Sequence, residues 1–523
     1  MTAKGGQAPS VPVPALLEDL VRTSETVAGM SARSAKVTAL AELLRRLRPD
    51  EVPIAVAYLA GGLPHAPIRV GWATLRSVPS PSAGPPTLQL PDVDAALRRV
   101  GSASGTGSQA VRRRELDALF ARATAAEQTF LTRLIHGELR QGALEGVMVE
   151  AVARAAQLPA PEVRRALMLA GDLGAVAAAA LAEGRAGLAG FALELLRPVQ
   201  PMLAQSAETP AEALQRVGRA AVEWKLDGAR LQVHRSGGEV RAFTRNLADA
   251  TDRVPEVVEA VLRLPLEAAV FDGEAIALRA DGRPHPFQVT MSRFGSTVDV
   301  KGHRDRVPLS TVFFDCLHLD GDDLLDRPLN ERRAALQERV PEEMRPAAVE
   351  TDDPAEAERF LGAALASGHE GVMVKALAAP YEAGRRGGAW LKVKPVRTLD
   401  LVVLAAEWGH GRREGRLSNL HLGARDPERG GFVMLGKTFK GMTDVMLAWQ
   451  TERLLELETH REGHVVHVRP ELVVEIAFDG VQTSTRYPGG VALRFARVKG
   501  YRPDKSPQDA DTIDAVRAIH AGR

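Results

Sequence analysis

The first part of the chain, roughly residues 1–190, spaces its apolar residues with the period of an α-helix. The segments ALLEDLVRTSETVAGM and KVTALAELLRRLR show this spacing, and so does most of the stretch from residue 113 to residue 157. Residues 77–86 and 101–108 interrupt it with Gly, Pro and Ser, which is a loop composition. We therefore predict a helical region that ends at RPVQPMLAQ, where two prolines mark a domain boundary between helical and alternating segments.

From residue 218 the pattern changes to the alternation of β-strands. RLQVHR and EVRAFTR flank the turn SGG and predict a β-hairpin. Further strands are predicted at AAVFDGEAIALR, STVFFDCLHL, EGVMVKAL and WLKVKP, with helices such as NERRAALQERV between them. We expect an α+β domain with largely antiparallel sheets. In the hairpin, alternation places Leu231 and Val233 on the core side and His234 at the surface.

After about residue 398, beginning with LDLVVLAAEWG, the chain shows short strands and glycine turns. One helix is predicted at MTDVMLAWQTERLLELETHR. This pattern suits a small five-stranded β-barrel of the OB type. The 523 residues are too many for one ordinary domain. The predicted domains are a helical one at 1–196, an α+β one at 197–397 and an OB-fold barrel at 398–523.

Composition and charge add two exclusions. Apolar residues make up 45% and charged residues 25%, the balance of a globular protein, and the N-terminus lacks the apolar core of a signal peptide, so we expect a cytoplasmic protein. The single cysteine, Cys316, excludes a disulfide framework and a four-cysteine zinc site, and its apolar neighbours predict a buried, inert thiol. A net charge of +1 still allows DNA binding if the cations share one face.

Lysine is scarce in this chain, with 11 lysines against 56 arginines, and none lies between Lys36 and Lys225. Lys225 stands in EWKLDGARLQVHR, directly before a turn-forming Asp-Gly. Arginine stays charged in proteins, whereas a lysine can lose its proton and act as a nucleophile. The position therefore indicates nucleophilic chemistry.

Alternation also decides which charged side chains can converge on Lys225. In the first predicted strand, Asp272 and Glu274 share one face, and in the second, Glu370 shares a face with Val372 and Val374. In the third, Lys392 and Lys394 point one way while Leu391 and Val393 point the other. Together they would hold a polyphosphate and a divalent metal beside an amine. We expect burial and the two lysines to lower the pKa of Lys225. Singly, each feature also has a structural explanation: a solvated lysine, the polar face of a strand, or a core position for Phe314.

The ordered segments EWKLDGAR, TRNLADAT, FDGE, FFDCLHLDG, GHEGVMVK, WLKVKP and LRFARVKGYRPDK resemble the motif series of ATP-dependent DNA ligases, within the covalent nucleotidyltransferases. The motifs span residues 223–505. The resemblance implies an enzyme that uses ATP and Mg²⁺ or Mn²⁺ to seal nicks in duplex DNA. A lysyl-AMP forms, its AMP passes to the 5′-phosphate, and the 3′-hydroxyl expels AMP. It also implies a monomer that encircles DNA at the bacterial nucleoid.

The resemblance implies a role for each motif residue. Lys225 would carry the AMP, Glu223 would contact the adenine edge, and Phe314 would stack on the adenine ring. Arg230 and Arg245 would contact ribose, phosphates or the DNA 5′-phosphate, while Glu274 would bind ribose or metal and Glu370 would bind metal. The AMP phosphate would be contacted by Arg386, Lys392 and Lys394, and pyrophosphate would be oriented by Arg497, Arg502, Asp504 and Lys505. Gly500 departs from the pattern, which has an arginine there, and Lys499 is the candidate substitute.

Two further expectations concern DNA and movement. The barrel must reorient between steps, and we expect its hinge at Val396 to Asp400. The helical region would contact DNA phosphates through Arg133, His136 and Arg140, although a solvated helix face explains these residues equally well.

Several other protein classes share parts of this pattern. An RNA ligase or an mRNA-capping guanylyltransferase has KxDG and an OB domain, but the helical N-terminal region and the RPDK ending favour a DNA ligase. An NAD-dependent ligase would need a zinc-cysteine module. A non-catalytic DNA-end-binding scaffold would not need the catalytic residues. Replication, repair and recombination all require nick sealing, so the motifs do not assign a pathway.

Overall fold

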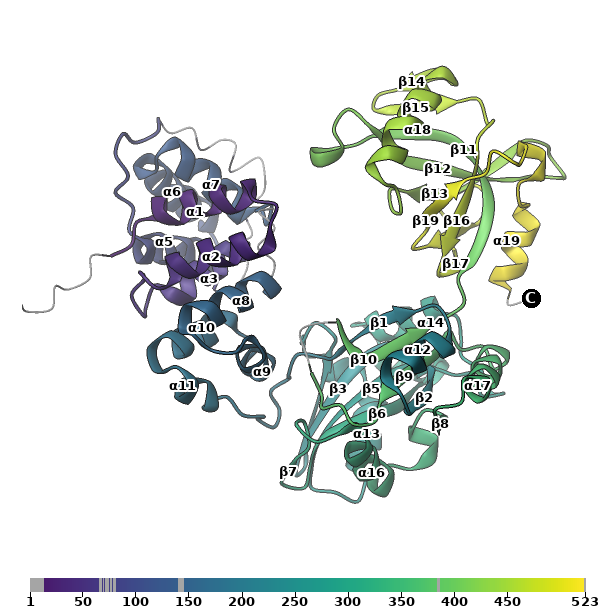
Figure 1. Cartoon of the computed structure of the whole chain (residues 1–523), viewed down its shortest axis with the longest axis horizontal. Coiled ribbons are helices and arrows are strands. Elements are labelled where there is room, and N and C mark those ends of the chain that lie inside the picture. Colours follow the sequence, from purple (N-terminus) through teal and green to yellow (C-terminus); the bar gives the residue numbers. More distant parts are fainter. Residues whose placement is uncertain are drawn as a thin grey trace, which may run out of the picture.

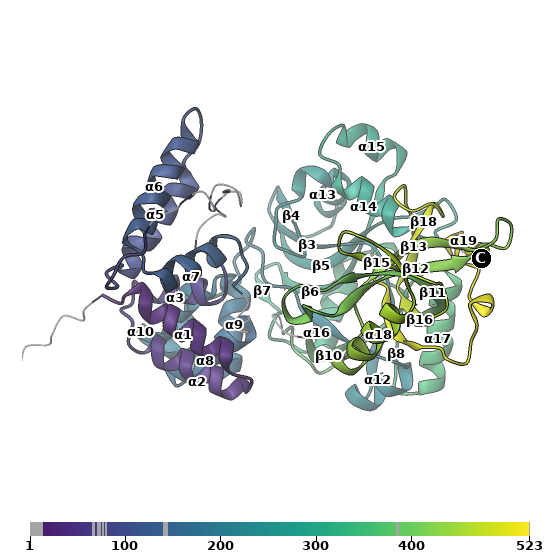
Figure 2. The same ribbon diagram turned by 90° about the horizontal axis from the view of Figure 1, so that it is seen from above.

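The computed structural model of the chain describes residues 14–64, 68, 70, 75, 78, 81–139, 145–382 and 386–521. Three regions follow one another along the chain, and the helical and C-terminal regions flank the central one like the arms of an open C (Figure 1). Seen from above, the C-terminal region overlies the central one, while the helices stand beside it (Figure 2). Within the described residues, no helix is long and apolar enough to cross a bilayer.

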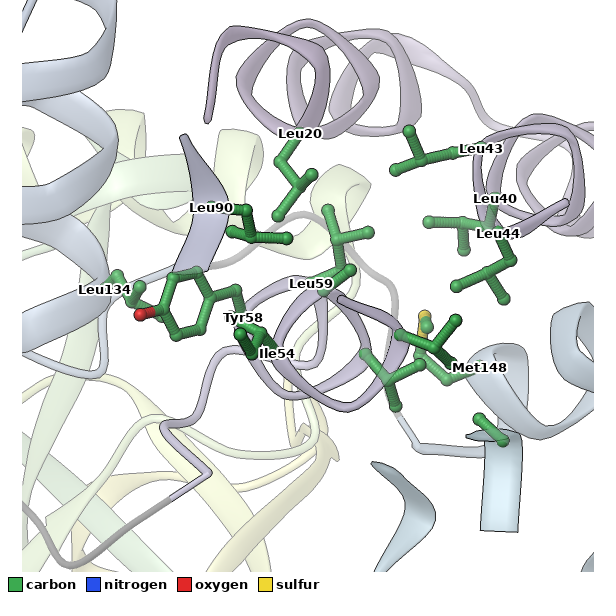
Figure 3. Close-up of a cluster of buried hydrophobic side chains, with 14 of the residues drawn as sticks. Leu20, Leu40, Leu43, Leu44, Ile54, Tyr58, Leu59, Leu90, Leu134 and Met148 are labelled. Carbon is green, nitrogen blue, oxygen red and sulfur yellow. The ribbon is translucent and has the colours of Figure 1, made fainter. Parts of the chain in front are cut away.

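The N-terminal region is helical, as predicted. Its helices are α1 (Leu17–Gly29), α2 (Arg33–Leu44), α3 (Val52–Leu59), α5 (Leu90–Ser102), α6 (Ser108–Arg122), α7 (Ala125–Ile135), α8 (Glu145–Ala156), α9 (Ala160–Ala170), α10 (Leu173–Glu183) and α11 (Arg185–Ala189). The loop predicted at 101–108 is shorter, because α5 continues to Ser102 and α6 begins at Ser108. Leucines of α1 and α2 pack on Tyr58 and Ile54 of α3 and on Met148 of α8, which makes one continuous core (Figure 3).

The central region contains two five-stranded sheets. The first has the order β1 (Leu203–Ala207), β10 (Arg386–Val393), β9 (Gly371–Ala376), β2 (Ala220–Lys225), β8 (Ala348–Thr351), and only β1 and β10 are parallel. The second has the order β4 (Glu239–Thr244), β3 (Ala229–Ser236), β5 (Ala268–Ala277), β6 (Leu309–Leu319), β7 (Asp322–Asp323), antiparallel throughout. The α+β prediction is therefore confirmed.

Helices cover one face of each sheet. Residues of α12 (Pro210–Val217) and α17 (Pro354–Ala366) share a core with β2, β9 and β10. Residues of α13 (Pro255–Leu262), α14 (Phe287–Gly295) and α16 (Leu329–Arg339) share one with β3, β5 and β6, and α15 (Val300–Arg306) follows α14. Cys316 is buried there, as predicted, and burial raises the pKa of its thiol.

The prediction that His234 lies at the surface is wrong. Leu231 and Val233 are in the core as expected, but His234 is also fully buried. The segment that leaves the helical region covers this second face: the Leu196 N–H donates to His234 Nδ1 at 3.2 Å, and Gln232 exchanges two hydrogen bonds with the Val199 backbone. Burial lowers the pKa of His234 to about 3. Alternation identified two strand faces but could not show that both are covered.

The C-terminal region is a β-rich domain. Its elements are β11 (Arg397–Trp408), β12 (Leu417–Arg425), β13 (Phe432–Thr438), α18 (Asp444–Glu456), β14 (Glu458–Glu462), β15 (Val465–Val468), β16 (Val473–Phe478), β17 (Gly480–Thr483), β18 (Val491–Arg494), β19 (Arg497–Tyr501) and α19 (Ile513–His520). Strands β13, β12, β11, β16 and β19 are neighbours in that order. The Val498 N–H donates to the Lys440 carbonyl at 2.9 Å, two residues after β13, which brings β19 next to the end of that strand. This arrangement is consistent with the predicted OB-type barrel.

Two boundaries in this region differ from the prediction. A helix was predicted over the whole of MTDVMLAWQTERLLELETHR, but it ends at Glu456, and the residues of this segment from Glu458 onward belong to β14. The expected hinge at Val396 to Asp400 falls mostly in β11, where Arg397 to Asp400 pair with β16. The irregular backbone between the central and C-terminal regions is therefore confined to residues 394–396, of which Val396 is 54% exposed.

Candidate active site

A cleft of about 1050 Å³ lies where the two central sheets meet the C-terminal region. Most of the predicted site residues line it: Glu223, Lys225, Arg230, Arg245, Glu274, Phe314, Glu370, Lys392 and Lys394. Residues that the sequence analysis did not assign also line it: Asp227, Lys375, Trp390, Asp479, Arg494 and Phe495. Residues from many separate segments thus converge around the KLDG turn.

Lys225 is the last residue of β2, and its ammonium group forms an ion pair with Glu370 in the cleft. Burial alone would lower the pKa of Lys225, but the carboxylates of Glu370, Glu274 and Asp227 outweigh it and raise the pKa. The prediction that burial and the two lysines lower this pKa is therefore wrong. The main charges that act on the amine are carboxylates and not the two lysines, and a protonated amine is no nucleophile.

Glu370 does not share a face with Val372 and Val374, contrary to the prediction. Those valines pack in the core below the sheet, whereas Glu370 points into the cleft. The reason is Gly371, whose φ of +149° lies outside regular strand geometry and interrupts the alternation. A Cβ there would lie 2.2 Å from the Val393 carbonyl oxygen, so a residue with a side chain does not fit.

The glycine of KLDG brings two strands together. The Gly228 N–H donates to Glu274 Oε1 at 3.1 Å, and a Cβ on Gly228 would lie 2.5 Å from the Ala275 oxygen. Burial raises the pKa of Glu274 to about 7, against the opposing effect of Lys225 and Arg230. Burial and the charge of Glu370 also raise the pKa of Asp227. The carboxyl groups of the site therefore lie so close together, and so deeply buried, that the ionised forms of Asp227 and Glu274 are disfavoured.

Arg230 is held by protein groups. Its guanidinium makes a bidentate pair with Asp272, at 3.0 and 2.6 Å, and donates to the Met202 carbonyl at 2.8 Å. The Tyr381 hydroxyl donates to the same carboxylate at 2.6 Å. Asp272 and Glu274 do share a face of β5, since both lie near Arg230, but Asp272 is committed to this buried network. Arg230 borders the cleft and supports its floor.

The predicted lysine pair has the expected orientation. Leu391 and Val393 are buried in the sheet core, while Lys392 and Lys394 line the cleft. Lys394 Nζ lies 2.7 Å from Asp479 and 3.7 Å from Glu370. Arg245 is exposed at the cleft. The side chain of Arg386 is outside the described residues.

One end of the cleft is an aromatic pocket with a buried carboxylate. Glu223, 3% exposed, accepts from Arg333 at 2.7 Å and pairs with Lys375 Nζ at 2.5 Å. The Lys375 ammonium lies 4.6 Å from the centre of the Phe314 ring and 4.5 Å from that of Trp390. A second cavity of about 490 Å³ continues from here past Glu223 and Phe314. The sequence analysis did not assign Lys375 to the site, although a lysine at the end of the motif GHEGVMVK, in a chain with few lysines, was a usable signal.

The β17–β18 hairpin closes the other side of the cleft. Arg494 Nη1 lies 3.1 Å from the Asp227 carboxylate, and its guanidinium is 4.0 Å from the centre of the Phe287 ring. The next residue, Phe495, is 59% exposed and has a φ of +53°, which is unusual for a bulky residue. No spacing in the sequence indicates these contacts, because Asp227 and Arg494 are brought together only by the packing of two regions.

The last motif reaches the cleft only through its first residues, Leu493 to Phe495, and none of the four residues assigned to pyrophosphate lines it. Arg502 and Lys505 pair with Asp400 at 3.2 and 2.5 Å, and Arg502 pairs with Asp504 at 2.6 Å. Arg497 pairs with Asp479 at 3.1 Å and approaches the cleft only through that residue. Lys499 is exposed, and Gly500 lies opposite Glu475 in the β16–β19 pairing.

The candidate DNA-contacting residues of the helical region are only partly described. Arg133 is exposed near the end of α7, and His136 is half-buried. Arg140 lies outside the described residues. Contact between Arg133 and DNA phosphates therefore stays a prediction.

Comparison with known proteins identifies three matching families in chain order. Residues 72–153 match "DNA ligase N terminus", residues 201–394 match "ATP dependent DNA ligase domain", and residues 413–505 match "ATP dependent DNA ligase C terminal region". A probable DNA ligase of Anaeromyxobacter sp. (strain Fw109-5) is 62% identical, with 97% of this chain and 98% of that protein aligned. A probable DNA ligase of Mycobacterium sp. (strain KMS) is 59% identical, with 97% and 99% aligned.

A solved structure has the same overall fold. It bears the name Pmar-Lig_Pre, has a TM-score of 0.60 and 19% sequence identity, and the match covers 92% of this chain and 99% of that one. At this identity the likeness concerns the fold. It confirms the prediction of a helical region, an antiparallel α+β domain and a C-terminal β-rich domain.

Proposed function

This chain belongs to the ATP-dependent DNA ligases, a family that seals nicks through a covalent AMP intermediate, and on that premise we propose that Lys225 carries the AMP. One observation supports this most directly: the Lys225 amine lies in the cleft against Glu370, a carboxylate that can take its proton. Lys375 is instead committed to Glu223, and Lys394 to Asp479. Lys225 is the cleft lysine that stands at the KLDG turn and makes the shorter contact with Glu370.

The first chemical step follows from this pair. Glu370 accepts a proton from Lys225 Nζ, and the freed electron pair attacks the α-phosphorus of ATP. An N–P bond forms, the P–O bond to the β-phosphate breaks, and pyrophosphate leaves with that electron pair. Lys392 and Lys394 lie on the phosphate side of the cleft and stabilise the charge that develops on the oxygens.

The carboxyl groups around Lys225 fit a divalent cation. Asp227, Glu274 and Glu370 all act on Lys225, and the raised pKa values of Asp227 and Glu274 indicate that their ionised forms are disfavoured. A hard cation, which binds oxygen ligands, would stabilise the ionised forms of these carboxyl groups. We infer that Glu274 and Glu370 hold Mg²⁺, or Mn²⁺ in its place, with Glu370 using the carboxylate oxygen that does not face Lys225. When bound, the ion would neutralise phosphate charge.

We expect Glu274→Gln to remove a destabilisation that appears as the pH rises. A carboxyl whose pKa is raised from 4.5 to about 7 on folding binds its proton more tightly in the folded state, so wild-type stability falls between those values. In the absence of metal at pH 8, the variant should melt at a higher temperature than wild type, with a free energy of unfolding larger by on the order of 1–3 kcal/mol. At pH 4.5 the two proteins should melt at the same temperature. Thermal unfolding at both pH values measures this. A constant difference between the proteins would show that Glu274 is not the titrating group.

We assign the aromatic end of the cleft to the adenine base. Phe314 offers a ring for stacking, and Glu223 offers carboxylate oxygens to the amino edge of the base. Arg245 is the exposed cation that would meet phosphates of the nucleotide or of the nick. Arg230 acts by supporting the cleft, and Arg386 keeps the phosphate role implied by its motif.

We propose that the C-terminal domain alternates between two orientations. In the one described, the β17–β18 hairpin faces the cleft, while Arg502 and Lys505 are held by Asp400. For the attack of Lys225 on ATP, the opposite face of the C-terminal domain would have to point at the cleft, so that Arg497, Arg502 and Lys505 could orient pyrophosphate. The irregular backbone at residues 394–396 is the candidate hinge. The division into domains at 1–196, 197–397 and 398–523 is consistent with this movement.

The Asp227–Arg494 pair provides a test of this alternation. We expect Arg494→Ala to slow sealing of a nick whose 5′-end already carries AMP by on the order of tenfold to a hundredfold, the size expected when a partly buried charge pair is broken. Formation of lysyl-AMP should change much less, because it uses the other orientation. Arg486→Ala, an exposed arginine in the loop between β17 and β18, is the matched control. Equal loss in both steps would contradict the two-orientation proposal.

We propose nicked duplex DNA as the macromolecular partner. The open C of Figure 1 leaves the helical and C-terminal regions on either side of the central domain, an arrangement in which one monomer can surround a duplex. Arg133 and the exposed Phe495 are candidate contacts to phosphate and to the minor groove. Such binding should weaken with salt. The proposed location is the cytoplasm, at the nucleoid.

A substrate comparison tests the proposed activity. The protein is incubated with Mg²⁺ and either ATP or GTP labelled at the α-phosphate, and then with nicked DNA or nicked RNA. We expect protein labelling by ATP and sealing of the DNA nick. Preference for GTP would favour a capping enzyme, sealing of RNA alone an RNA ligase, and absence of label a non-catalytic DNA-end-binding scaffold.

A further inference from the structure

The C-terminal domain contains a group of histidines that the ligase reaction does not use. Four of the 13 histidines of the chain belong to it: His421 lies on β12, His460 on β14, His464 in the turn between β14 and β15, and His467 on β15. In Figure 1, β14 and β15 lie at the end of the domain opposite β17, whose residue Gln482 lines the cleft. This group is therefore separate from the carboxylates around Lys225.

Two carboxylates accompany these histidines, and they differ in availability. Glu407 already accepts from Asn419 at 2.6 Å and from His421 at 3.1 Å, and it pairs with Lys437. Although burial opposes it, these hydrogen bonds hold the pKa of Glu407 at about 2. Glu407 is thus neutralised by protein groups. Glu462, with 72% of its side chain exposed, pairs only loosely with histidines.

The strand pairing places His460, Glu462 and His467 on one surface. His460 is directly opposite His467 in the β14–β15 ladder, and Glu462 is two residues along the same strand. The two imidazole rings are stacked with centres 4.3 Å apart. Glu462 oxygens lie 3.8 Å from His460 Nε2 and 3.7 Å from His467 Nε2, and one ligand atom from each of the three residues lies within 4.8 Å of the other two.

A neighbouring hydroxyl orients the first histidine for metal binding. Thr459 has no partner in the ladder, and its hydroxyl donates its single hydrogen to the His467 carbonyl oxygen at 3.2 Å. Its oxygen, 3.2 Å from His460 Nδ1, is then an acceptor for the ring N–H. This tautomer leaves the lone pair of His460 Nε2 directed at Glu462. Metal-binding histidines are typically held in this way by a partner on the second ring nitrogen.

We propose that His460, His467 and Glu462 form a surface site for a divalent d-block cation of the Zn²⁺ class. Two imidazole nitrogens and one carboxylate oxygen are a ligand set that Zn²⁺ accepts, with water in the fourth position. Small rotations of exposed side chains bring the three atoms to the spacing of a tetrahedral site. The ion would join both strands of the hairpin at a point remote from the adenylylation chemistry.

Calorimetric titration with Zn²⁺ tests the site. Chelator-treated full-length protein is titrated in excess Mg²⁺, which occupies oxygen-ligand sites but does not compete for imidazole. Wild type should show one saturable Zn²⁺ equivalent that His460→Ala/His467→Ala loses. Glu462→Gln should weaken binding at least about tenfold, and Thr459→Val, which spares all three ligands, by a similar factor. His303→Ala, a histidine of α15, should bind as wild type.

Thermal melting adds a readout that does not depend on activity. Zn²⁺ should raise the melting temperature of wild type and of His303→Ala but not that of the double variant, because a ligand that binds only the folded state stabilises it. If circular dichroism shows that the double variant is unfolded, Glu462→Gln decides alone. Unchanged binding in Glu462→Gln and the double variant, or absence of saturable binding in wild type, would overturn the proposal.

Discussion

Lys225→Ala should abolish both lysyl-AMP formation and the sealing of nicked DNA with ATP, with a loss on the order of 10⁴-fold or more, as expected when a covalent nucleophile is removed. Lys225→Arg should be equally inactive, because it keeps the charge beside Glu370 but cannot attack phosphorus. Gel assays of labelled protein and of nick closure measure the two activities. Lys301→Ala, an exposed lysine of the same central domain, is the matched control and should remain active.

A pre-adenylylated nick separates loss of the nucleophile from loss of the fold. When the DNA already carries AMP on its 5′-phosphate, the first two steps are bypassed, and Lys225→Ala should still join the ends at a measurable rate. Sealing of ordinary nicks by Lys225→Ala at the wild-type rate would contradict the assignment. Failure on both substrates, together with an altered circular dichroism spectrum, would instead identify Lys225 as a structural residue.

Glu223→Ala should have the second largest effect, on stability and on ATP use together. The carboxylate is 3% exposed and pairs with both Arg333 and Lys375, so its removal leaves Lys375 without its carboxylate and Arg333 with only the longer contact to Glu350. Breaking a buried pair in this way destabilises a protein by about 3–5 kcal/mol. We expect a clear fall in the melting temperature and, at temperatures where the variant is folded, a large increase in the KM for ATP.

Glu350 offers a control that shares one of these partners. It lies 3.8 Å from Arg333 but is 42% exposed, so Glu350→Ala should change stability and the KM for ATP little. Glu223→Gln should lie between wild type and Glu223→Ala in stability, since it keeps the shape and loses the charge. If Glu223→Ala melts like wild type, the buried ion pairs do not stabilise this fold. If its KM for ATP is unchanged, Glu223 does not contact the base.

The sequence predicted which residues gather in the cleft better than it predicted their electrostatics. The scarce lysine at KLDG and the alternating faces of β10 correctly placed Lys225, Lys392 and Lys394 in one cleft. The pKa of Lys225 was predicted in the wrong direction, because the distance to Glu370 depends on a backbone irregularity at Gly371. One-dimensional alternation assumes regular strands, and a single glycine reversed the side on which its neighbour lies.

The fold was predictable where one sheet or helix face determined the pattern. Leu231 and Val233 were placed correctly, but the burial of His234 depends on a segment more than thirty positions earlier in the chain that covers the second face. The Asp227–Arg494 pair has a separation of 267 positions and arises from the packing of two regions. Local patterns carry no information about such contacts, so the hairpin that closes the cleft was not found.

The most direct test is to locate the AMP on the protein. After reaction with ATP and Mg²⁺, tryptic peptides are analysed at neutral pH by mass spectrometry. We predict AMP on the peptide AAVEWKLDGAR, residues 220–230, with Lys225 modified and therefore uncleaved. AMP on Lys375, Lys392 or Lys394 instead, or stable labelling of Lys225→Ala, would contradict the central claim that Lys225 is the nucleophile.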